Sequence, residues 1–472
     1  MIRFFNTLSG KLEEFKPLTQ NEVKIYTCGP TVYDYAHIGN FRAFVFEDLL
    51  RRFLEFSGYK VKHVMNLTDV DDKTIAGAQR ENKKLEEFTE KYTTAFQEDL
   101  KALNCLLPNH PAEQPRATRE IPVMIDLIAK LIQKGVAYQN GGSVYYKIEK
   151  FQDYGKLSKK KLDKNIAGAS KRLDADEYDR EQISDFVLWK GAKEGEPSWD
   201  SPWGKGRPGW HIECSAMSMK YLGETFDIHA GGEDLIFPHH ENEIAQSEAA
   251  TGKKFVNTWL HCKFLLVNGE KMSKSKGNFF TLRDLLAKGH DPMAIRYQLL
   301  STHYRNTLNF TEDGLKEANE VIKRARACYM DCFSALKNPF TGKHDDIQLP
   351  PLQGVINAMT DSLENDLNIS VCFGAFSGAI RFINSFLLPL KLNASQLDDA
   401  INFFKKVDQL LGLKITEVET VPEKIEKMLA ELVEHRKNKN FSEADRIRKT
   451  INDEGWVVKD GRPGQPSKVV KK

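Results

Sequence analysis

A short cationic stretch, Lys271 to Asn278, has the residue types of a polyphosphate-binding loop. Lys271 and Lys274 are separated by Met272 and a serine, and Gly277 allows a tight turn after them. Lysine ammonium groups act as point charges on phosphate oxygens, and serine hydroxyls add hydrogen bonds. A lysine-rich octamer is more often a solvated turn, so this interpretation needs a partner segment elsewhere in the chain.

A second segment, Cys28 to Asn40, could supply that partner. It follows an alternating stretch at residues 23–27, which predicts a strand, and precedes apolar residues with helical spacing at 41–56. His37 and Gly39 therefore stand where a helix begins. A helix N-terminus presents N–H groups and a positive dipole end to phosphate, and glycine lets a nucleotide approach the backbone.

Four further side chains have the chemistry of a metal site. Cys28 and Cys214 offer thiolates, and His239 and Glu243 are spaced to share one face of a helix. Two thiolates, an imidazole and a carboxylate suit tetrahedral zinc. Spacing alone does not select this set, because a lone cysteine is often a core residue. Other side chains are rival ligands: His211, His229, His240, His261 and Cys262.

The two candidate nucleotide segments together resemble the paired signatures of class I aminoacyl-tRNA synthetases. His37 to Asn40 is similar to their histidine-isoleucine-glycine-histidine motif, with asparagine in the last position, and Lys271 to Ser275 matches their lysine-methionine-serine-lysine-serine loop. Four longer phrases resemble the cysteinyl-tRNA synthetases in particular: Thr27–Asp34, Asn66–Lys73, Gly206–Cys214 and Phe237–Glu243. This resemblance extends over nearly the whole chain.

The resemblance implies an ATP-dependent cysteine–tRNA ligase that forms a cysteinyl-adenylate, with ATP, L-cysteine and tRNA(Cys) as partners. It implies one zinc ion per chain on Cys28, Cys214, His239 and Glu243, and Mg²⁺ accompanying ATP. Cys262 is expected to lie outside this set. The other expected roles are catalysis by His37, Lys271 and Lys274, ATP binding by Gly29, His37, Gly39, Asn40 and Lys274, and cysteine binding by Thr68, Trp210 and His229.

Zinc would allow the enzyme to reject serine, which differs from cysteine only by oxygen in place of sulfur. An apolar pocket separates such near-isosteres by roughly a hundredfold. A soft metal ion prefers sulfur and binds an alcohol poorly, so direct metal–thiolate contact can supply the remaining selectivity. We therefore expect discrimination during activation and no separate editing site.

The strands and helices that must position these residues alternate along the sequence, which predicts an α/β fold. Strands and helices alternate in a doubly wound, Rossmann-type catalytic domain that is interrupted by a connecting insertion and followed by a helical bundle and a small C-terminal tRNA-binding domain. The insertion includes a lysine-rich stretch, 156–172, that we interpret as a solvated loop. The expected divisions are 1–117 and 201–262 (the two catalytic halves), 118–200 (insertion), 263–315 (lysine loop and stem contact), 316–415 (bundle) and 423–472 (anticodon binding).

Composition limits the classes to which the protein can belong. The net charge of the 472 residues is only +2, so a nucleic-acid surface must be local. The seven cysteines are scattered, which argues against a disulfide framework and for a reducing compartment. No apolar stretch approaches the roughly 18 residues of a membrane span. We expect a cytoplasmic monomer without a membrane partner.

The C-terminal tail holds the local positive charge. From His435 to Lys472 there are 11 Lys and Arg against 5 Asp and Glu, a net 11 − 5 = +6. We interpret 423–453 as helical, with Arg436 to Arg448 as a helix that carries a basic face suited to the phosphate backbone. Such runs are often only solvated, but the resemblance to the anticodon-reading domain of cysteinyl-tRNA synthetases favours tRNA.

Two alternatives to a tRNA ligase remain open. One is a ligase of the same fold that joins cysteine to an amino sugar, but those relatives lack a tRNA-binding C-terminal domain. The other is an inactive homologue that only binds tRNA or zinc. The retained Lys271, Lys274, His37 and Gly39 argue against loss of activity.

Overall fold

The computed structural model describes residues 1–108, 113–160, 185–273, 277–336, 339, 352–388, 392–417, 422–460 and 467–471. The chain divides into two compact units, Met1–Ile415 and Thr416–Lys472. Each unit has a hydrophobic core of its own. In the described part of the chain, no helix is long and apolar enough to cross a membrane.

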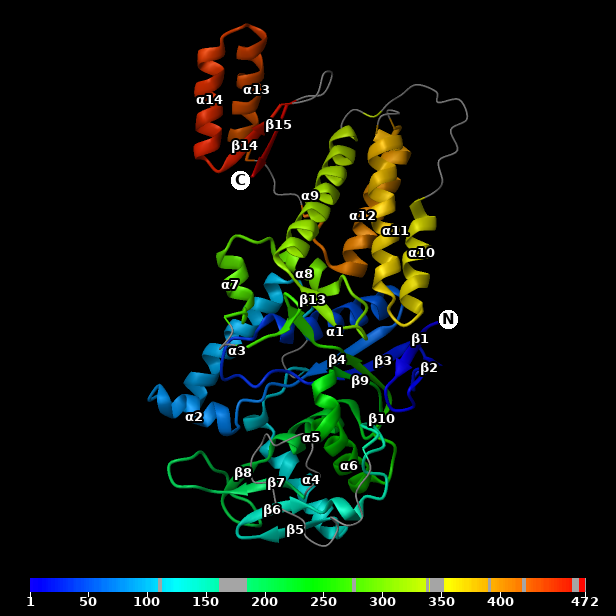
Figure 1. Ribbon diagram of the computed structural model, residues 1–472, viewed down its shortest axis with the longest axis vertical. Coiled ribbons are helices and arrows are strands. Elements are labelled where there is room, and N and C mark those ends of the chain that lie inside the picture. The colour runs from blue at the N-terminus through cyan, green and yellow to red at the C-terminus, as the bar shows by residue number, and fades with distance from the viewer. Residues whose placement is uncertain are drawn as a thin grey trace. The chain divides into compact units, whose positions relative to one another are not determined.

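A four-stranded parallel sheet lies at the centre of the first unit (Figure 1). Its strands are β3 (Glu22–Thr27), β4 (Lys60–Met65), β9 (Phe226–Gly232) and β10 (Val256–Cys262). They lie in the order β10–β9–β3–β4. Because all four are parallel, their carboxyl ends meet at one edge, which is where sheets of this kind bind ligands.

Helices cover both faces of this sheet, which confirms the predicted α/β fold. Helix α1 (Ile38–Phe56) connects β3 to β4 and packs on one face, whereas α5 (Trp210–Leu222) packs against β3 and β4 from the other (Figure 1). The apolar residues predicted to face one side of α1, from Phe44 to Leu54, are buried. Three more helices follow the sheet strands: α2 (Asp72–Arg80), α3 (Leu85–Ala102) and α6 (Glu241–Thr251).

The segment between the two halves of the sheet forms a small layer of its own. Helix α4 (Ile121–Gln133) packs against α5 and α6, and a four-stranded antiparallel sheet follows it. Its strands are β5 (Ala137–Asn140), β6 (Ser143–Tyr146), β7 (Phe186–Gly191) and β8 (Gly206–Pro208). Most of the predicted lysine-rich loop, 161–172, lies outside the described residues.

One buried carboxylate fastens this layer to α6. The Glu241 side chain is fully buried and accepts hydrogen bonds from the backbone N–H groups of Gly155 (2.9 Å), Leu157 (3.2 Å) and Ser158 (2.7 Å). Several backbone donors aimed at one carboxylate offset the cost of burying its charge. The N-terminal end of α6, close to two candidate metal ligands, is thereby held in place.

The remainder of the first unit surrounds the sheet. The chain begins with a hairpin, β1 (Arg3–Asn6) and β2 (Lys11–Glu14), and β11 (Leu265–Val267), β12 (Glu270–Lys271) and β13 (Leu308–Phe310) form a further sheet. Two helices accompany it, α7 (Leu282–Ala287) and α8 (Pro292–Leu300). Four long helices then follow: α9 (Glu312–Ala335), α10 (Leu352–Glu364), α11 (Ile369–Phe382) and α12 (Ala394–Leu411). Helix α11 continues as a wider turn, Ile383–Leu387.

A buried ion cluster joins α1 to the end of α12. Arg296 on α8 is fully buried, forms an ion pair with Asp48 on α1, and donates to the carbonyl of Leu411 at 2.8 Å. Arg52 also pairs with Asp48, at 2.8 Å. Burial alone would raise the pKa of Asp48, but the two guanidinium groups hold it below its ordinary value. Asn104 completes the junction by donating to the Gly412 carbonyl at 2.9 Å.

The second unit corrects one prediction. Instead of one continuous helix over 423–453, it contains α13 (Glu423–Lys437) and α14 (Phe441–Asp453), packed as a pair, with β14 (Trp456–Lys459) and β15 (Lys468–Lys471) forming a two-stranded antiparallel sheet. The predicted helix at 436–448 is wrong because Lys439 has a φ of 60°, in the left-handed region that ends a helix. Asn438 and Asn440, which flank it, are weak helix formers.

Candidate metal centre and nucleotide site

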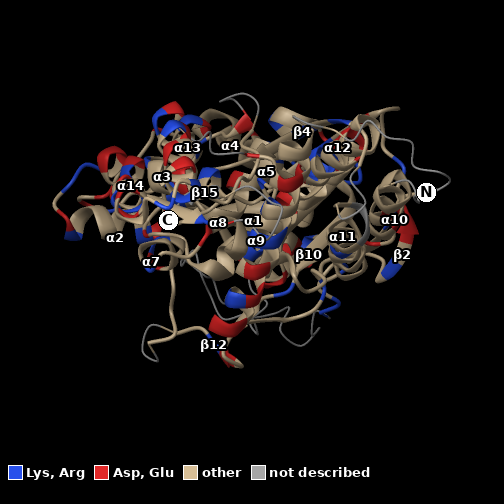
Figure 2. Ribbon diagram, turned by 90° about the horizontal axis from the view of Figure 1, so that it is seen from above, with Lys and Arg blue, Asp and Glu red and all other residues tan. Residues whose placement is uncertain are grey.

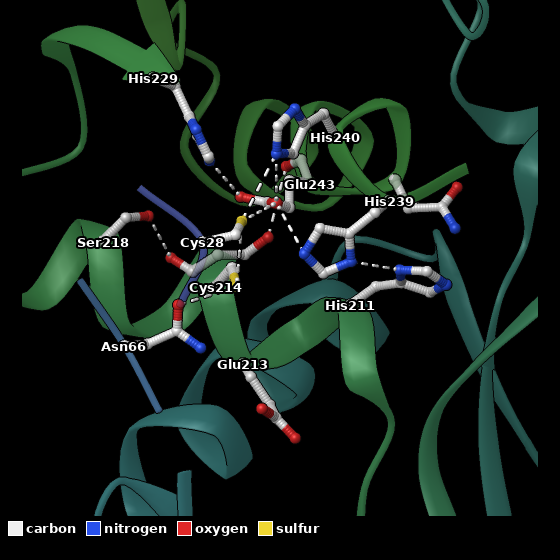
Figure 3. A network of polar contacts seen from close by, with 12 residues as sticks. Cys28, Asn66, His211, Glu213, Cys214, Ser218, His229, His239, His240 and Glu243 are labelled. Atoms are coloured by element: carbon white, nitrogen blue, oxygen red, sulfur yellow. Dashed lines mark hydrogen bonds and ion pairs between the residues drawn. The ribbon is translucent and has the colours of Figure 1, made fainter. Parts of the chain in front are cut away.

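Four candidate ligands from separate elements meet beside the carboxyl end of β3 (Figure 3). Cys28 directly follows β3, and Cys214 lies in the first half of α5. His239 belongs to a short wide helical turn, Ile236–His240, and Glu243 to the first turn of α6. All four side chains are buried, and their ligand atoms lie within 4.8 Å of one another.

The spacing of these atoms fits a tetrahedral ion. The Sγ atoms of Cys28 and Cys214 are 3.7 Å apart, Cys28 Sγ is 3.7 Å from Glu243 Oε1, and His239 Nε2 is 3.1 Å from the same oxygen. With Zn–S bonds of about 2.3 Å and Zn–O or Zn–N bonds of about 2.0–2.1 Å, tetrahedral geometry gives edges of about 3.3–3.8 Å. Of these three distances, the two that involve Cys28 fall in this range and the His239–Glu243 distance is somewhat short.

Burial shifts the pKa values of three of the four groups. Burial raises the pKa of the Cys28 thiol well above its ordinary value and raises that of Cys214, while burial lowers the pKa of His239 well below its ordinary value. These groups are therefore neutral thiols and a neutral imidazole on their own. A divalent ion reverses this preference, because it stabilises thiolates directly.

The surroundings of His239 show most directly that this site is arranged for a cation. Its Nε2 forms no hydrogen bond with any described residue, although a carboxylate oxygen of Glu243 lies 3.1 Å away. Its other nitrogen, Nδ1, lies 2.9 Å from Nδ1 of His211. Burial lowers the pKa of His211 to about 3, so that ring is neutral and its Nδ1 can accept a hydrogen bond from His239 Nδ1. The His239 Nε2 lone pair then faces the Glu243 carboxylate, as two ligands of one ion would.

A second group of side chains overlaps the first. His229 and His240 can share an ion with Cys28 and Glu243, since their ligand atoms also lie within 4.8 Å. The Nε2 atoms of this group already have hydrogen-bond partners, whereas His229 Nδ1 has none among the described residues. His229 Nε2 contacts Glu243 Oε2 at 3.0 Å, and His240 Nε2 contacts Cys28 Sγ at 3.4 Å. We favour the first group, because it contains two thiols and the unpartnered nitrogen of His239.

Other rival ligands lie outside both groups. His261 Nε2 contacts His240 Nδ1 at 2.9 Å, and its own Nδ1 contacts Thr7, so it supports His240 from behind. Cys262 belongs to neither group, and its Sγ lies 3.8 Å from the carbonyl of Arg42.

Two of the three candidate cysteine-binding residues contact a candidate ligand, and the third contacts the residue before Cys214. Trp210 is half-buried and stacks on His239 with ring centroids 4.1 Å apart. His229 is fully buried, stacks on Trp259, and contacts Glu243, so its ring also supports a candidate ligand. Thr68 is buried, and its hydroxyl donates to Glu213 at 2.7 Å.

The first nucleotide segment forms a reciprocal cap at the start of α1. The backbone N–H of Asn40 donates to His37 Nδ1 at 3.2 Å, and the His37 N–H donates to Asn40 Oδ1 at 3.1 Å. Because Nδ1 accepts a hydrogen bond, a neutral His37 ring carries its proton on Nε2. That nitrogen is a donor, which is the polarity that a phosphate oxygen requires.

The two nucleotide segments lie together, although they are distant in sequence. The backbone N–H of Ile38 donates to the carbonyl of Phe280 at 3.0 Å, and the His37 ring packs edge-on against Phe279 at 5.3 Å. A side chain at Gly39 would approach Met272 to within 3.2 Å. The chain that leaves the lysine loop is therefore attached to the residues that begin α1.

The lysine loop is described only at its ends. Lys271 is exposed at the end of β12, whereas Lys274 lies outside the described residues. The Asn278 side chain closes the loop: it accepts from the Ser273 N–H at 2.8 Å and donates to the Lys271 carbonyl at 3.2 Å.

Gly29 is required by a close backbone approach at the turn after Cys28. A Cβ atom at this position would lie 1.6 Å from the carbonyl oxygen of Asn66. The Gly29 N–H donates to the Asn66 side chain at 3.0 Å. The turn thereby fixes Cys28 against the segment that follows β4.

Comparison with known proteins assigns the family. The family described as tRNA synthetases class I (C) catalytic domain matches residues 14–320. A cysteine–tRNA ligase of Chlamydia muridarum (strain MoPn / Nigg) is 47% identical over 482 residues, with 99% of each chain covered. The chain belongs to the cysteine–tRNA ligase family.

Further comparisons agree with this assignment. A cysteine–tRNA ligase of Brachyspira hyodysenteriae (strain ATCC 49526 / WA1) is 47% identical over 474 residues and covers 98% of each chain. Among solved structures, Mycobacterium tuberculosis methionyl-tRNA synthetase in complex with methionyl-adenylate superposes with a TM-score of 0.58, covering 84% of this chain and 90% of that one. Its sequence identity of 14% supports the class I fold alone. The protein is an enzyme of the cysteine–tRNA ligase class.

The second unit carries a small exposed surface of mixed character. Its helices α13 and α14 bear residues of both charges (Figure 2). Arg436 and Arg448 both pair with Asp460, at 2.5 and 2.7 Å, so part of the expected basic face is neutralised. Lys437 and Lys439 remain exposed beside the turn between the helices, and Phe441, at the start of α14, is 62% exposed.

Two residues of the site were quoted in the sequence motifs but given no role there. Asn66 links Gly29, Thr68 and Cys214, and Glu213 accepts from Thr68 while fully buried. A charged residue beside a candidate ligand in a helix that is otherwise mostly apolar was the available signal for Glu213. Asn66 had no such signal, since an asparagine after a strand is usually part of a turn.

Proposed function

We propose that the enzyme joins L-cysteine to tRNA(Cys) in two steps, through a cysteinyl-adenylate made from ATP and Mg²⁺. The observation that carries the proposal is the meeting of the buried Cys28, Cys214, His239 and Glu243 beside the carboxyl end of β3, from which the chain continues to the start of α1. A sulfur-selective centre and a phosphate-binding helix start that follow the same strand suit the activation of cysteine. The names of the full-length relatives support the same reaction.

Zinc is the ion that this ligand set fits. When bound, zinc supplies a soft Lewis acid that favours the thiol of cysteine over the hydroxyl of serine. Cys28, Cys214, His239 and Glu243 would hold it, and His211 would orient His239 through the 2.9 Å contact between the two rings. Selectivity would then reside in the activation step.

The nucleotide would lie between the two signatures. His37 would donate from Nε2 to a phosphate oxygen, Asn40 would maintain the cap, and the backbone at Gly29 and Gly39 would lie beside the nucleotide. Lys271 and Lys274 would neutralise the charge that develops as pyrophosphate leaves. No general base is needed, because the cysteine carboxylate is itself the nucleophile and positioning with charge stabilisation carries the step.

The cysteine would occupy the space that Thr68, Trp210 and His229 border. The tRNA would be read by residues 423–472, with Phe441 as a stacking surface and Lys437 and Lys439 as phosphate contacts. The remaining divisions we propose are catalytic halves at 1–117 and 201–262, an insertion at 118–200, a stem-contact region at 263–315 and a bundle at 316–415.

The amino-sugar ligase and the inactive homologue receive less support. The relatives named cysteine–tRNA ligase match over 98–99% of this chain, which includes the C-terminal region that the amino-sugar ligases lack. The retained His37, Gly39, Lys271 and Lys274 argue against an inactive protein.

Cysteine-dependent ATP–pyrophosphate exchange and tRNA charging, compared between the full chain and residues 1–422, would test the proposal. Truncation spares every proposed activation residue, so exchange should persist, while the apparent KM for tRNA should rise. The dependence of tRNA binding on salt should become shallower by roughly 0.7–0.9 for each phosphate that the shortened chain no longer neutralises. Full charging by the truncated chain would contradict the anticodon assignment, and absence of cysteine-dependent exchange in the full chain would contradict the activation chemistry.

A further inference from the structure

Glu213 is a fully buried carboxylate for which the proposed reaction has no role so far. It precedes Cys214 on α5, and its Oε2 accepts the hydroxyl proton of Thr68 at 2.7 Å. We propose that Glu213 is a positioning residue that turns the Thr68 hydroxyl into an acceptor for the ammonium group of the substrate cysteine and supplies the opposing charge. This inference deepens the proposed function and rests on it.

The hydrogen bonds around Thr68 determine which way its hydroxyl points. The N–H of Gly29 donates to Asn66 Oδ1 at 3.0 Å, which identifies the oxygen of the Asn66 amide. The amide nitrogen therefore faces Thr68, and donates to its Oγ1 at 3.3 Å. A hydroxyl has one proton and two lone pairs. With the proton given to Glu213 and one lone pair taken by Asn66, the only capacity left on Thr68 is to accept.

The same network places Thr68 next to the candidate metal centre. Asn66 Oδ1, besides accepting from Gly29, lies 3.6 Å from Cys214 Sγ. Asn66 and Thr68 are both buried, at 1% exposure each. A substrate cysteine held by its sulfur at this centre carries its ammonium group only three bonds from that sulfur. Because Asn66 bridges Thr68 and Cys214, this ammonium group would point toward the side of the pocket that Thr68 forms.

Of the groups on a free cysteine near Thr68, the ammonium is the one that fits. It donates hydrogen bonds and is positive, so it matches the remaining lone pair on Thr68 and the negative charge of Glu213 behind it. The cysteine carboxylate would face a hydroxyl with no proton to give and a like charge. Thr68 and Glu213 would therefore leave the substrate carboxylate free to reach the nucleotide, as adenylation requires.

The inference specifies the class of small thiol that the pocket accepts. Cysteine and cysteamine both have an ammonium group next to the thiol, whereas 3-mercaptopropionate has a carboxylate and no ammonium. Binding of the first two should depend on Glu213, and binding of the third should not. A purely structural role for Glu213 would affect all three thiols equally.

The experiment measures Kd for the three thiols by calorimetry on the zinc-loaded full chain. In Glu213→Gln, which keeps the size of the side chain and removes its charge, Kd for cysteine and for cysteamine should rise at least tenfold. Kd for 3-mercaptopropionate should change less than twofold or fall. Glu120→Gln is a matched control: Glu120 is a buried carboxylate that pairs with Lys220 at the far end of α5, and its loss should change none of the three constants.

Each outcome separates the inference from the proposed function. Equal weakening of all three thiols, or no weakening, in Glu213→Gln overturns the role of Glu213 while the proposed function stands. Failure of the wild-type enzyme to bind cysteine overturns the proposed function itself. If Glu213→Gln does not fold or load zinc, Thr68→Val takes its place, because it removes the acceptor. Thr68→Val must then raise Kd for cysteine and cysteamine but not for 3-mercaptopropionate. An equal change for all three thiols refutes the inference.

Discussion

Replacing Phe441 by alanine should weaken tRNA binding without disturbing the fold. Phe441 begins α14, directly after the turn that contains Lys439, and its side chain is 62% exposed. An exposed aromatic beside lysines is an arrangement that stacks on unpaired bases, such as those of an anticodon loop. Because the ring is mostly in solvent, its removal should change the free energy of unfolding by no more than about 0.5 kcal/mol.

The expected loss of tRNA affinity follows from the energy of one stacking contact. Base–aromatic stacking contributes about 1–3 kcal/mol per base. At about 1.4 kcal/mol per decade, this corresponds to a rise of roughly 5- to 150-fold in the apparent Kd or KM for tRNA. Phe441→Trp should retain tRNA binding, since tryptophan offers at least as large a ring. The tRNA affinity of Phe441→Leu should lie between those of Phe441→Ala and the wild type.

Salt dependence separates the ring from the lysines around it. Phe441→Ala removes no charge, so the slope of log Kd against log salt should remain that of the wild type. Lys437→Ala and Lys439→Ala should each make this slope shallower by roughly 0.7–0.9, with a smaller loss of affinity near physiological salt. The assay is tRNA charging and filter binding over a range of salt, with cysteine-dependent ATP–pyrophosphate exchange measured in parallel.

Two results would refute this reasoning. If Phe441→Ala charged tRNA with an unchanged KM, the ring would not contact the nucleic acid. If it lowered pyrophosphate exchange as much as tRNA charging, the substitution would have damaged the protein rather than a tRNA contact.

Three further predictions concern the first unit. Cys214→Ser should lower zinc affinity at least tenfold, as measured by competition with a chromogenic chelator, and a wild-type affinity would exclude Cys214 as a ligand. Lys274→Ala should slow pyrophosphate exchange far more than it weakens cysteine binding, since its charge acts as the phosphates separate; equal losses would contradict this. Burial lowers the pKa of His63 from 6.5 to about 3, so the unfolded chain gains that proton first and stability falls by roughly 1.4 kcal/mol per pH unit below 6.5. His63→Gln should flatten the dependence of unfolding free energy on pH in that window, and an unchanged slope would count against it.

Local patterns in the sequence were sufficient for the elements that lie in the core. Apolar spacing predicted α1, and alternation predicted β3, because burial of one face dictates both patterns. The same reasoning failed at Lys439. Helical spacing of apolar residues continues through this position, but the backbone of Lys439 has a left-handed conformation that ends the helix. Arg436 and Arg448 also counted as free positive charge in the sequence, whereas Asp460 pairs with both.

The candidate site needed more than local patterns. Metal ligands are recognised by distance in space, and Cys28 and Cys214 are far apart in the chain. The motifs of related enzymes supplied that pairing. Spacing could not separate His239 from its neighbour His240, because both reach Glu243 and their difference lies in which ring nitrogen is left without a partner. The role of Glu213 depends on the direction of a single hydrogen bond, which no sequence pattern records.

The buried junction between α1 and the end of α12 limits how this enzyme can be shortened. Arg296 depends on the carbonyl of Leu411, and Asn104 on that of Gly412. A stop codon before residue 411 would remove one acceptor of the buried Arg296 guanidinium group, at a cost of about 1.5–3 kcal/mol. Arg296 would then depend more on its ion pair with Asp48, which lies in the helix whose first turn His37 caps. Residues up to 412 therefore belong to the minimal catalytic fragment, and the four long helices cannot be treated as a removable appendage.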